Sequence, residues 1–147
     1  MAKARFDFSA VEDMAKKLNA ISSDLTKQAV EKSLQRAQHL VAEQTRAAMA
    51  KHKEYSRKKA DSTENSIFDD GAVEWTADTV ASINVGFDLN KSGLVSIFLM
   101  KGTKLHGQPH IEPDRELYNA IYGSATKKKI QAIAQEEFNK AMQEAMK

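Results

Sequence analysis

Residues 24–51, DLTKQAVEKSLQRAQHLVAEQTRAAMAK, decide the fold more than any other stretch of the chain. Apolar residues recur there every three or four positions, with Thr45 filling one longer gap, while Glu31, Glu43 and Arg46 lie mostly on the other faces. This spacing predicts one long amphipathic helix from Asp24 to about Lys51. Its apolar positions are Val30, Leu34, Ala37, Val41 and Ala48.

A shorter helix is predicted before it. Residues 9–12, SAVE, form a capping box in which Ser9 caps the Glu12 amide and Glu12 reaches back. The helix should begin at about residue 10 and end before residues 19–23, whose side chains compete for backbone hydrogen bonds. Its apolar residues, which share one face, are Val11, Met14, Ala15 and Leu18.

Two further helices are predicted near the C-terminus. Pro113 suits a helix start, and the helix Asp114–Tyr122 should end at Gly123 as a left-handed cap. Ser124 can then cap a last helix with a long apolar stripe. The stripe contains Ile130, Ile133, Ala134, Phe138, Ala141, Met142 and Ala145.

The middle of the chain predicts a small sheet. Residues 79–88 alternate apolar and polar side chains, which is the period of a half-buried strand, and residues 94–100 form a second β-rich run after the turn residues 90–93. We expect these runs to pair as an antiparallel hairpin, with a third strand from about residue 72 to 76. Residues 101–113 contain several Gly and Pro residues and predict an irregular connection.

Residues 51–70 are predicted to be a long mobile loop. Their only apolar side chains are Tyr55, Ala60, Ile67 and Phe68, which offer little burial to offset the ordering entropy. The first half of the loop is basic and the second half is acidic, with Asp61, Glu64, Asp69 and Asp70. The expected fold is therefore one α+β domain over residues 1–147, with amphipathic helices packed on one face of a small antiparallel sheet.

Composition excludes several classes of function. The chain carries 22 Lys and Arg against 20 Asp and Glu, a formal charge of +2, so any contact with a polyanion must come from a local patch. It has no cysteine, which excludes disulfides, thiolate metal sites and a cysteine nucleophile. No apolar run approaches the roughly 18 residues of a membrane span, and no signal-peptide core is present. We therefore expect a protein made in the cytoplasm with no membrane contact.

Catalytic and cofactor motifs are not found. No Gly-x-Ser-x-Gly elbow and no phosphate-cradling glycine motif occurs, so we expect no enzyme activity and no cofactor. A loop could gather His106, His110, Glu112 and Asp114 around a divalent ion, but their spacing matches no established pattern. Polar loop side chains are the better interpretation, and we predict no metal site.

Two basic clusters are candidates for contact with DNA or with an acidic partner. The first lies at the start of the loop and consists of Lys51, Lys53, Arg57, Lys58 and Lys59. The second lies in the first turn of the last helix and consists of Lys127, Lys128 and Lys129. The helix dipole disfavours cations at that position, so either a binding role or a tolerated, solvated triplet explains them.

The order of a long helix, a polar loop, a hairpin, a Gly-Thr pair and two prolines before C-terminal helices resembles the tail-completion or neck protein family of long-tailed bacteriophages. The matching residues are Gly102, Thr103, Pro109 and Pro113. The chain departs from the family pattern in two places. Met100-Lys101 stands where an acidic residue usually precedes the Gly-Thr pair, and His110 replaces the usual aromatic residue after Pro109.

The resemblance implies a structural virion protein, a subunit of an oligomeric ring at the head-tail junction, with neighbouring connector and tail proteins as partners. The genome would pass through the lumen of such a ring, where non-specific DNA contact is possible. Ring contacts are heterologous and need two complementary patches on each chain. The alternative is a nucleic-acid-binding accessory protein that acts through its local lysine clusters.

Overall fold

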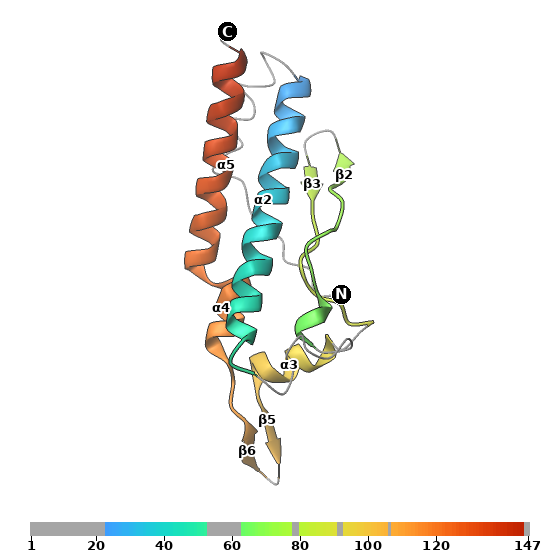
Figure 1. Cartoon of the computed structure of the whole chain (residues 1–147), viewed down its shortest axis with the longest axis vertical. Coiled ribbons are helices and arrows are strands. Elements are labelled where there is room, and N and C mark those ends of the chain that lie inside the picture. Colours follow the sequence, from blue (N-terminus) through green and yellow to red (C-terminus); the bar gives the residue numbers. More distant parts are fainter. Residues whose placement is uncertain (1–22, 53–62, 78–79, 91–92, 106, 146–147) are drawn as a thin grey trace.

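Two long antiparallel helices, α2 and α5, form the body of the protein (Figure 1). The structure, a computed structural model, describes residues 23–52, 63–77, 80–90, 93–105 and 107–145. Helix α2 (Ser23–Met49) confirms the predicted amphipathic helix, because Leu34, Ala37 and Val41 of its apolar stripe are buried. The helix predicted from residue 10 lies outside the described residues.

The second long helix follows a short one. Helix α4 (Arg115–Tyr122) is capped by Asp114, whose side chain accepts a hydrogen bond from the Leu117 amide, and α5 (Ser124–Ala145) follows directly. Gly123 between them is not the left-handed cap that we predicted, since its φ is −69° and its ψ is 154°. A glycine is needed there for space, because a Cβ would lie 2.5 Å from the Asn119 carbonyl oxygen.

In the part of the chain that the structure describes, the strands form three separate antiparallel pairs. Strand β1 (Ile67–Phe68) pairs with β4 (Gly86–Phe87), and β2 (Glu74–Ala77) pairs with β3 (Val80–Ser82). Strand β5 (Thr103–Leu105) pairs with β6 (Gln108–Ile111). The α+β class is confirmed, and β2 occupies the place of the predicted third strand.

The predicted pairing of residues 79–88 with residues 94–100 is wrong. Residues Leu94–Lys101 form a helix, α3, which ends where the Gly102 amide donates to the Phe98 carbonyl at 2.7 Å. A short run that is apolar on all sides suits a buried helix as well as a strand. The alternating burial predicted for residues 79–88 is nevertheless confirmed at Ile83, Val85 and Phe87, which are all buried.

The connection after α3 is not irregular, because it contains the β5–β6 hairpin. Gly102 and Gly107 take positive φ angles of 74° and 77° at the two ends of β5, a conformation that glycine adopts without strain. The hairpin extends beyond α3 and α4 at one end of the molecule (Figure 1). The Gly and Pro residues that predicted irregularity therefore mark the turns around two short strands.

The second half of the predicted mobile loop is part of the fold. A 3-10 turn (Glu64–Ser66) leads into β1, and Thr63, Ser66 and Ile67 are buried. The Ser66 hydroxyl donates to the Thr63 carbonyl at 2.6 Å, so local polar contacts replace the apolar burial that the sequence lacks. Residues 53–62 lie outside the described residues, and mobility of that part remains a prediction.

Helix α2 lies between α5 and the β2–β3 pair (Figure 1), and its two ends differ. We call the region around Val41–Met49 the closed end, because α3, α4, β1 and β4 contribute to the core there. Its members include Val41, Met49, Val85, Phe87, Leu99, Leu117 and Ile130. We call Leu25–Lys32 of α2 together with Glu137–Glu144 of α5 the open end, where the core is a small cluster around Ala29, Phe138 and Ala141.

Candidate functional site

The residues that carry the family resemblance gather at the base of the β5–β6 hairpin. A Cβ on Gly102 would lie 2.6 Å from the Ile111 carbonyl oxygen and 3.0 Å from the Pro113 ring, so the two ends of the hairpin meet at Gly102. Thr103 pairs with Ile111 in the same place, whereas Pro109 pairs with Lys104 farther along the hairpin. The structure therefore brings three of the four motif positions together.

The buried hydroxyl group of Thr103 is energetically unfavourable. Its hydroxyl oxygen is shielded from solvent and has no hydrogen-bond partner within the described part of the chain. A buried hydroxyl without a partner costs about 1–3 kcal/mol. Departures of this kind concentrate where function constrains a protein, which makes the hairpin base a candidate site.

Asp114 joins the hairpin base to the end of α2. Its side chain is almost fully buried and caps α4 through the Leu117 amide at 3.0 Å. Its Oδ2 lies 2.6 Å from Nε2 of His52, and its Oδ1 accepts from Nζ of Lys51 at 3.0 Å. The Asp114 amide donates to the Leu99 carbonyl at 2.8 Å, so one residue links α3, α4 and the two residues Lys51 and His52 that follow α2.

These contacts set the charge state of the cluster. Burial alone would raise the pKa of Asp114, but the hydrogen bonds from His52, Leu117 and Lys51 outweigh it and lower that pKa below its ordinary value. The hydrogen bond to Glu116, followed by that to Asp114, raises the pKa of Lys51. The site is therefore an ionised carboxylate surrounded by donors, which suits a structural joint.

The sequence missed this cluster. His52 and Asp114 are 62 positions apart, and no spacing pattern connects them. The metal hypothesis had grouped Asp114 with His106, His110 and Glu112, but Asp114 contacts His52 and Lys51 instead, and His106 lies outside the described residues. Within the described ranges, no three His, Asp or Glu side chains converge closely enough to hold a metal ion.

The two basic clusters have different surroundings. Lys51 forms ion pairs with Asp114 and Glu116, both at 3.0 Å, so its charge is compensated within the chain. Lys53, Arg57, Lys58 and Lys59 lie outside the described residues. On α5, three exposed lysines follow one another, and the last of them donates to Oε1 of Gln44 at 2.8 Å. They are Lys127, Lys128 and Lys129.

The acidic half of the predicted loop is also partly neutralised inside the chain. Asp69 accepts from Arg46 at 3.2 Å, and Nδ1 of His39 lies 3.3 Å from the same oxygen. The Arg46 hydrogen bond is the main cause that lowers the pKa of Asp69. Asp69 therefore attaches the segment before β2 to α2, and only part of the predicted charge dipole is available to another chain.

Comparison with known proteins finds no relative of this chain. No model of a protein family, no curated protein and no solved structure matches the chain. Among the described residues, no helix is both long enough and apolar enough to cross a membrane.

Proposed function

We propose that the protein is a structural subunit of an oligomeric ring at the head-tail junction of a long-tailed bacteriophage, where it completes or joins the tail. The observation that carries this proposal is the β5–β6 hairpin at the end of the molecule (Figure 1). A two-stranded ladder is only marginally stable alone, and its outer edges present unpaired backbone groups to another chain. The motif residues at its base are those of the resembling family.

Exposed aromatic side chains on the two helices that flank the hairpin in sequence support the proposal. Phe98 of α3 and Tyr118 of α4 are 45% and 47% exposed, on the two helices that flank the hairpin in sequence. Large aromatic residues are enriched in protein interfaces. The hairpin with Phe98 and Tyr118 would form one patch of a heterologous ring contact, and a different face of the next copy would form the other.

Sedimentation velocity and electron microscopy of the purified protein, alone and with heads and tails, test the proposal. We expect ring-shaped oligomers, and we expect Phe98→Glu and Tyr118→Glu to reduce their formation without loss of helical content. Val80→Glu is the matched control, because Val80 is 53% exposed but lies in β3, away from the hairpin. A wild-type chain that stays monomeric and binds neither heads nor tails contradicts the proposal.

A second test uses phage particles. Particles made without the protein should accumulate as separate heads and tails, and the protein should restore joining when it is added back. Normal particles that assemble without it would rule out a role at the junction.

The exposed lysines of α5 favour a second candidate, a nucleic-acid-binding accessory protein. If Lys127, Lys128 and Lys129 neutralise phosphates, their replacement by glutamine should flatten the salt dependence of duplex DNA binding, by up to about 0.9 in log-log slope for each lysine replaced. Lys101→Gln, an exposed lysine on α3, is the control. DNA binding that is undetectable at low salt would remove this candidate.

A further inference from the structure

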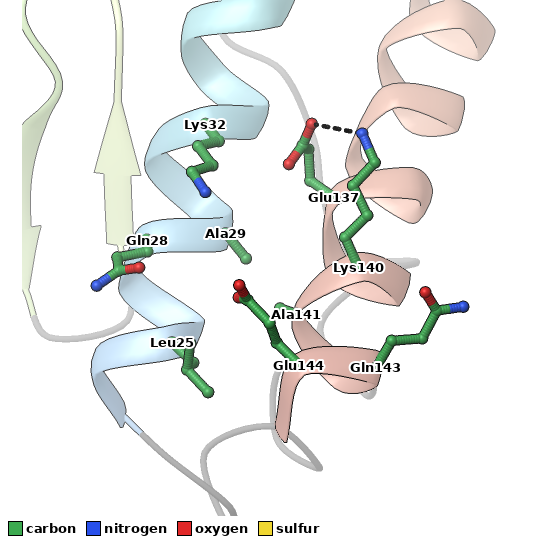
Figure 2. Close-up of a pocket in the computed structure, with 9 residues that line it drawn as sticks. All are labelled: Leu25, Gln28, Ala29, Lys32, Glu137, Lys140, Ala141, Gln143 and Glu144. Carbon is green, nitrogen blue, oxygen red and sulfur yellow. Dashed lines mark ion pairs between the residues drawn. The ribbon is translucent and has the colours of Figure 1, made fainter. Parts of the chain in front are cut away.

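Two of the hollows on the described surface differ in how their charged side chains are satisfied. In the groove between α2 and α5 at the open end, Glu137 is paired with Lys140 (Figure 2) at 3.7 Å and with Arg36 at 2.6 Å. The second hollow has a volume of about 460 Å³ and is lined mainly by β1 and by the connection from β1 to β2. Asp70 in that connection is exposed and forms no hydrogen bond or ion pair with any described residue.

Asp70 is followed by Gly71, and this is the one place in the sequence where a glycine follows an aspartate or an asparagine. The main-chain nitrogen of the residue after an aspartate can attack the Cγ atom of that aspartate and close a five-membered succinimide ring. A side chain on the following residue crowds this ring closure. Glycine has no side chain and adopts a wider range of backbone angles. The covalent chemistry therefore favours Asp70 over every other Asp and Asn in the chain.

The fold leaves both reacting groups of this pair accessible. Within the described part of the chain the Gly71 amide donates no hydrogen bond, and residues 69–73 belong to neither a helix nor a strand. The exposed side chain of Asp70 can therefore rotate toward that nitrogen and reach the close contact that ring closure needs. The hollow is open to the water that later opens the ring.

Two neighbouring sites are more restrained. Asp69 accepts from Arg46 at 3.2 Å, which keeps its carboxylate turned toward α2. Asn65 lines the same hollow, but the amide of Ser66 donates to the Thr63 carbonyl at 3.1 Å at the 3-10 turn. That hydrogen bond must open before the Ser66 nitrogen can attack, so the fold as well as the sequence selects the Asp-Gly pair.

We propose that Asp70 converts spontaneously to isoaspartate in the folded protein. The Gly71 nitrogen forms a bond to Cγ of Asp70, and the carboxyl hydroxyl leaves with the amide hydrogen as water. A second water then cleaves one of the two ring bonds to that nitrogen. Cleavage at Cγ restores aspartate, whereas cleavage at the α-carbonyl gives isoaspartate, in which the main chain runs through the former side chain. One water is lost and one is gained, so the mass is unchanged and no oxidant is needed.

The conversion should disturb the contact between β2 and α2. It adds one carbon to the main chain between Asp69, which is attached to α2, and β2. Gly71 lies close to α2, because a Cβ on it would be 3.0 Å from Nε2 of Gln38. Trp75 of β2 donates to Oε1 of Glu31 on α2 at 2.9 Å. A longer connection should shift β2 and weaken this hydrogen bond.

Incubation of the folded protein at physiological temperature and pH tests the proposal, with tryptic peptides separated by chromatography and the modified residue located by electron-transfer fragmentation. We expect isoaspartate to accumulate at residue 70, at a rate within about threefold of that in the urea-unfolded chain. Deamidation of Asn65 should be at least about tenfold slower in the folded protein than in the unfolded chain, because the Ser66 hydrogen bond must first open. Asp70→Glu is the matched control, since it keeps the charge but would have to close a larger ring.

Fluorescence supplies a second measurement, because Trp75 is the only tryptophan in the sequence. Its emission should change with the time course of isoaspartate formation in the wild-type protein and stay constant in Asp70→Glu. Isoaspartate that forms in the unfolded chain but not in the folded protein overturns the proposal, because the fold would then hold the two groups apart. Isoaspartate that forms without a change in fluorescence overturns the inferred shift of β2.

Discussion

The two ends of the α2–α5 pair are built from the same helices but complete their cores differently. At the closed end, Met49 and Leu117 are fully buried because α3, α4 and the β1–β4 pair cover them. At the open end, Ala29 and Ala141 face each other and leave a groove. The period of a helix decides which face is buried, and the size of the side chains on that face decides how completely the two helices fill the space between them.

The largest difference in the free energy of unfolding between the two ends is expected when a leucine at each end is replaced by alanine. Leu117→Ala at the closed end removes a fully buried side chain and should lower the free energy of unfolding by about 2–5 kcal/mol. Leu25→Ala at the open end should cost under about 1.5 kcal/mol, because Leu25 is only half-buried. Urea denaturation measures both, and equal losses would contradict the distinction.

The hairpin at the closed end offers a second comparison. Gly102→Ala should lower stability by about 3 kcal/mol, because its φ of 74° and ψ of 167° suit glycine alone and a Cβ would also meet the Ile111 carbonyl oxygen. Gly107→Ala should cost only about 1 kcal/mol, since its φ is 77° but nothing lies within 4 Å of a Cβ. Thermal unfolding of both variants checks the order, and a larger loss at Gly107 would refute it.

The Asp114 joint should be the next most sensitive position. Asp114→Ala removes the α4 cap and the contacts to His52 and Lys51, and should cost about 2 kcal/mol. Asp114→Asn keeps a capping oxygen and should cost less. Chemical denaturation of the two variants measures the difference. Identical stabilities would mean that the carboxylate charge contributes nothing to this joint.

The same joint predicts a pH dependence. The pKa of Asp114 is lowered in the folded protein, so its contribution is fully present above the unfolded value of about 3.9 and is lost as the pH falls through the lower folded value. Stability should therefore drop below about pH 4, and Asp69, whose pKa is also lowered, adds to the drop. Asp114→Asn should make the curve shallower in urea titrations, and an unchanged curve would contradict the assignment.

The smallest effect is expected at the boundary between the two ends. Arg36 lies 2.6 Å from Glu137 and 3.2 Å from Glu136, but its side chain is 40% exposed. Solvent screening limits such a bridge, so Arg36→Gln should cost under about 1 kcal/mol and less in high salt. Lys32→Gln is a control on the same helix. A loss above about 2 kcal/mol would show that this bridge, rather than apolar packing, holds the helices together.

Prediction from sequence succeeded where a pattern is local. The long helix α2 and the last helix α5 follow from the spacing of their apolar residues, and Asp114 to Gly123 bounds α4 correctly. The prediction for residues 94–100 was wrong because an apolar run without alternation fits a helix and a strand equally well. The side chains that pack around this run in the core favour the helix α3. The β5–β6 hairpin was missed because its strands are too short to show a period.

One part of the candidate site was also predictable from a local pattern, and another part was not. The importance of Gly102, Thr103 and Pro113 was predicted from a linear motif, and the structure places them at one hairpin base. The joint of Asp114 with His52 and Lys51 has no such signal, because a carboxylate followed by a helix looks like an ordinary N-cap. Partners distant in sequence are visible only after folding has brought them together.

The amino-acid sequence by itself determined the amphipathic helices α2 and α5, the start and stop of α4, and the alternating burial of Ile83, Val85 and Phe87. These features depend on backbone periodicity and on neighbouring residues. Only the tertiary structure decided that residues 94–101 are helical, that β1 pairs with β4, and that the α2–α5 pair is closed at one end and open at the other. Those features depend on which surfaces meet, because the free energy of burial belongs to the contact between segments and to neither segment alone.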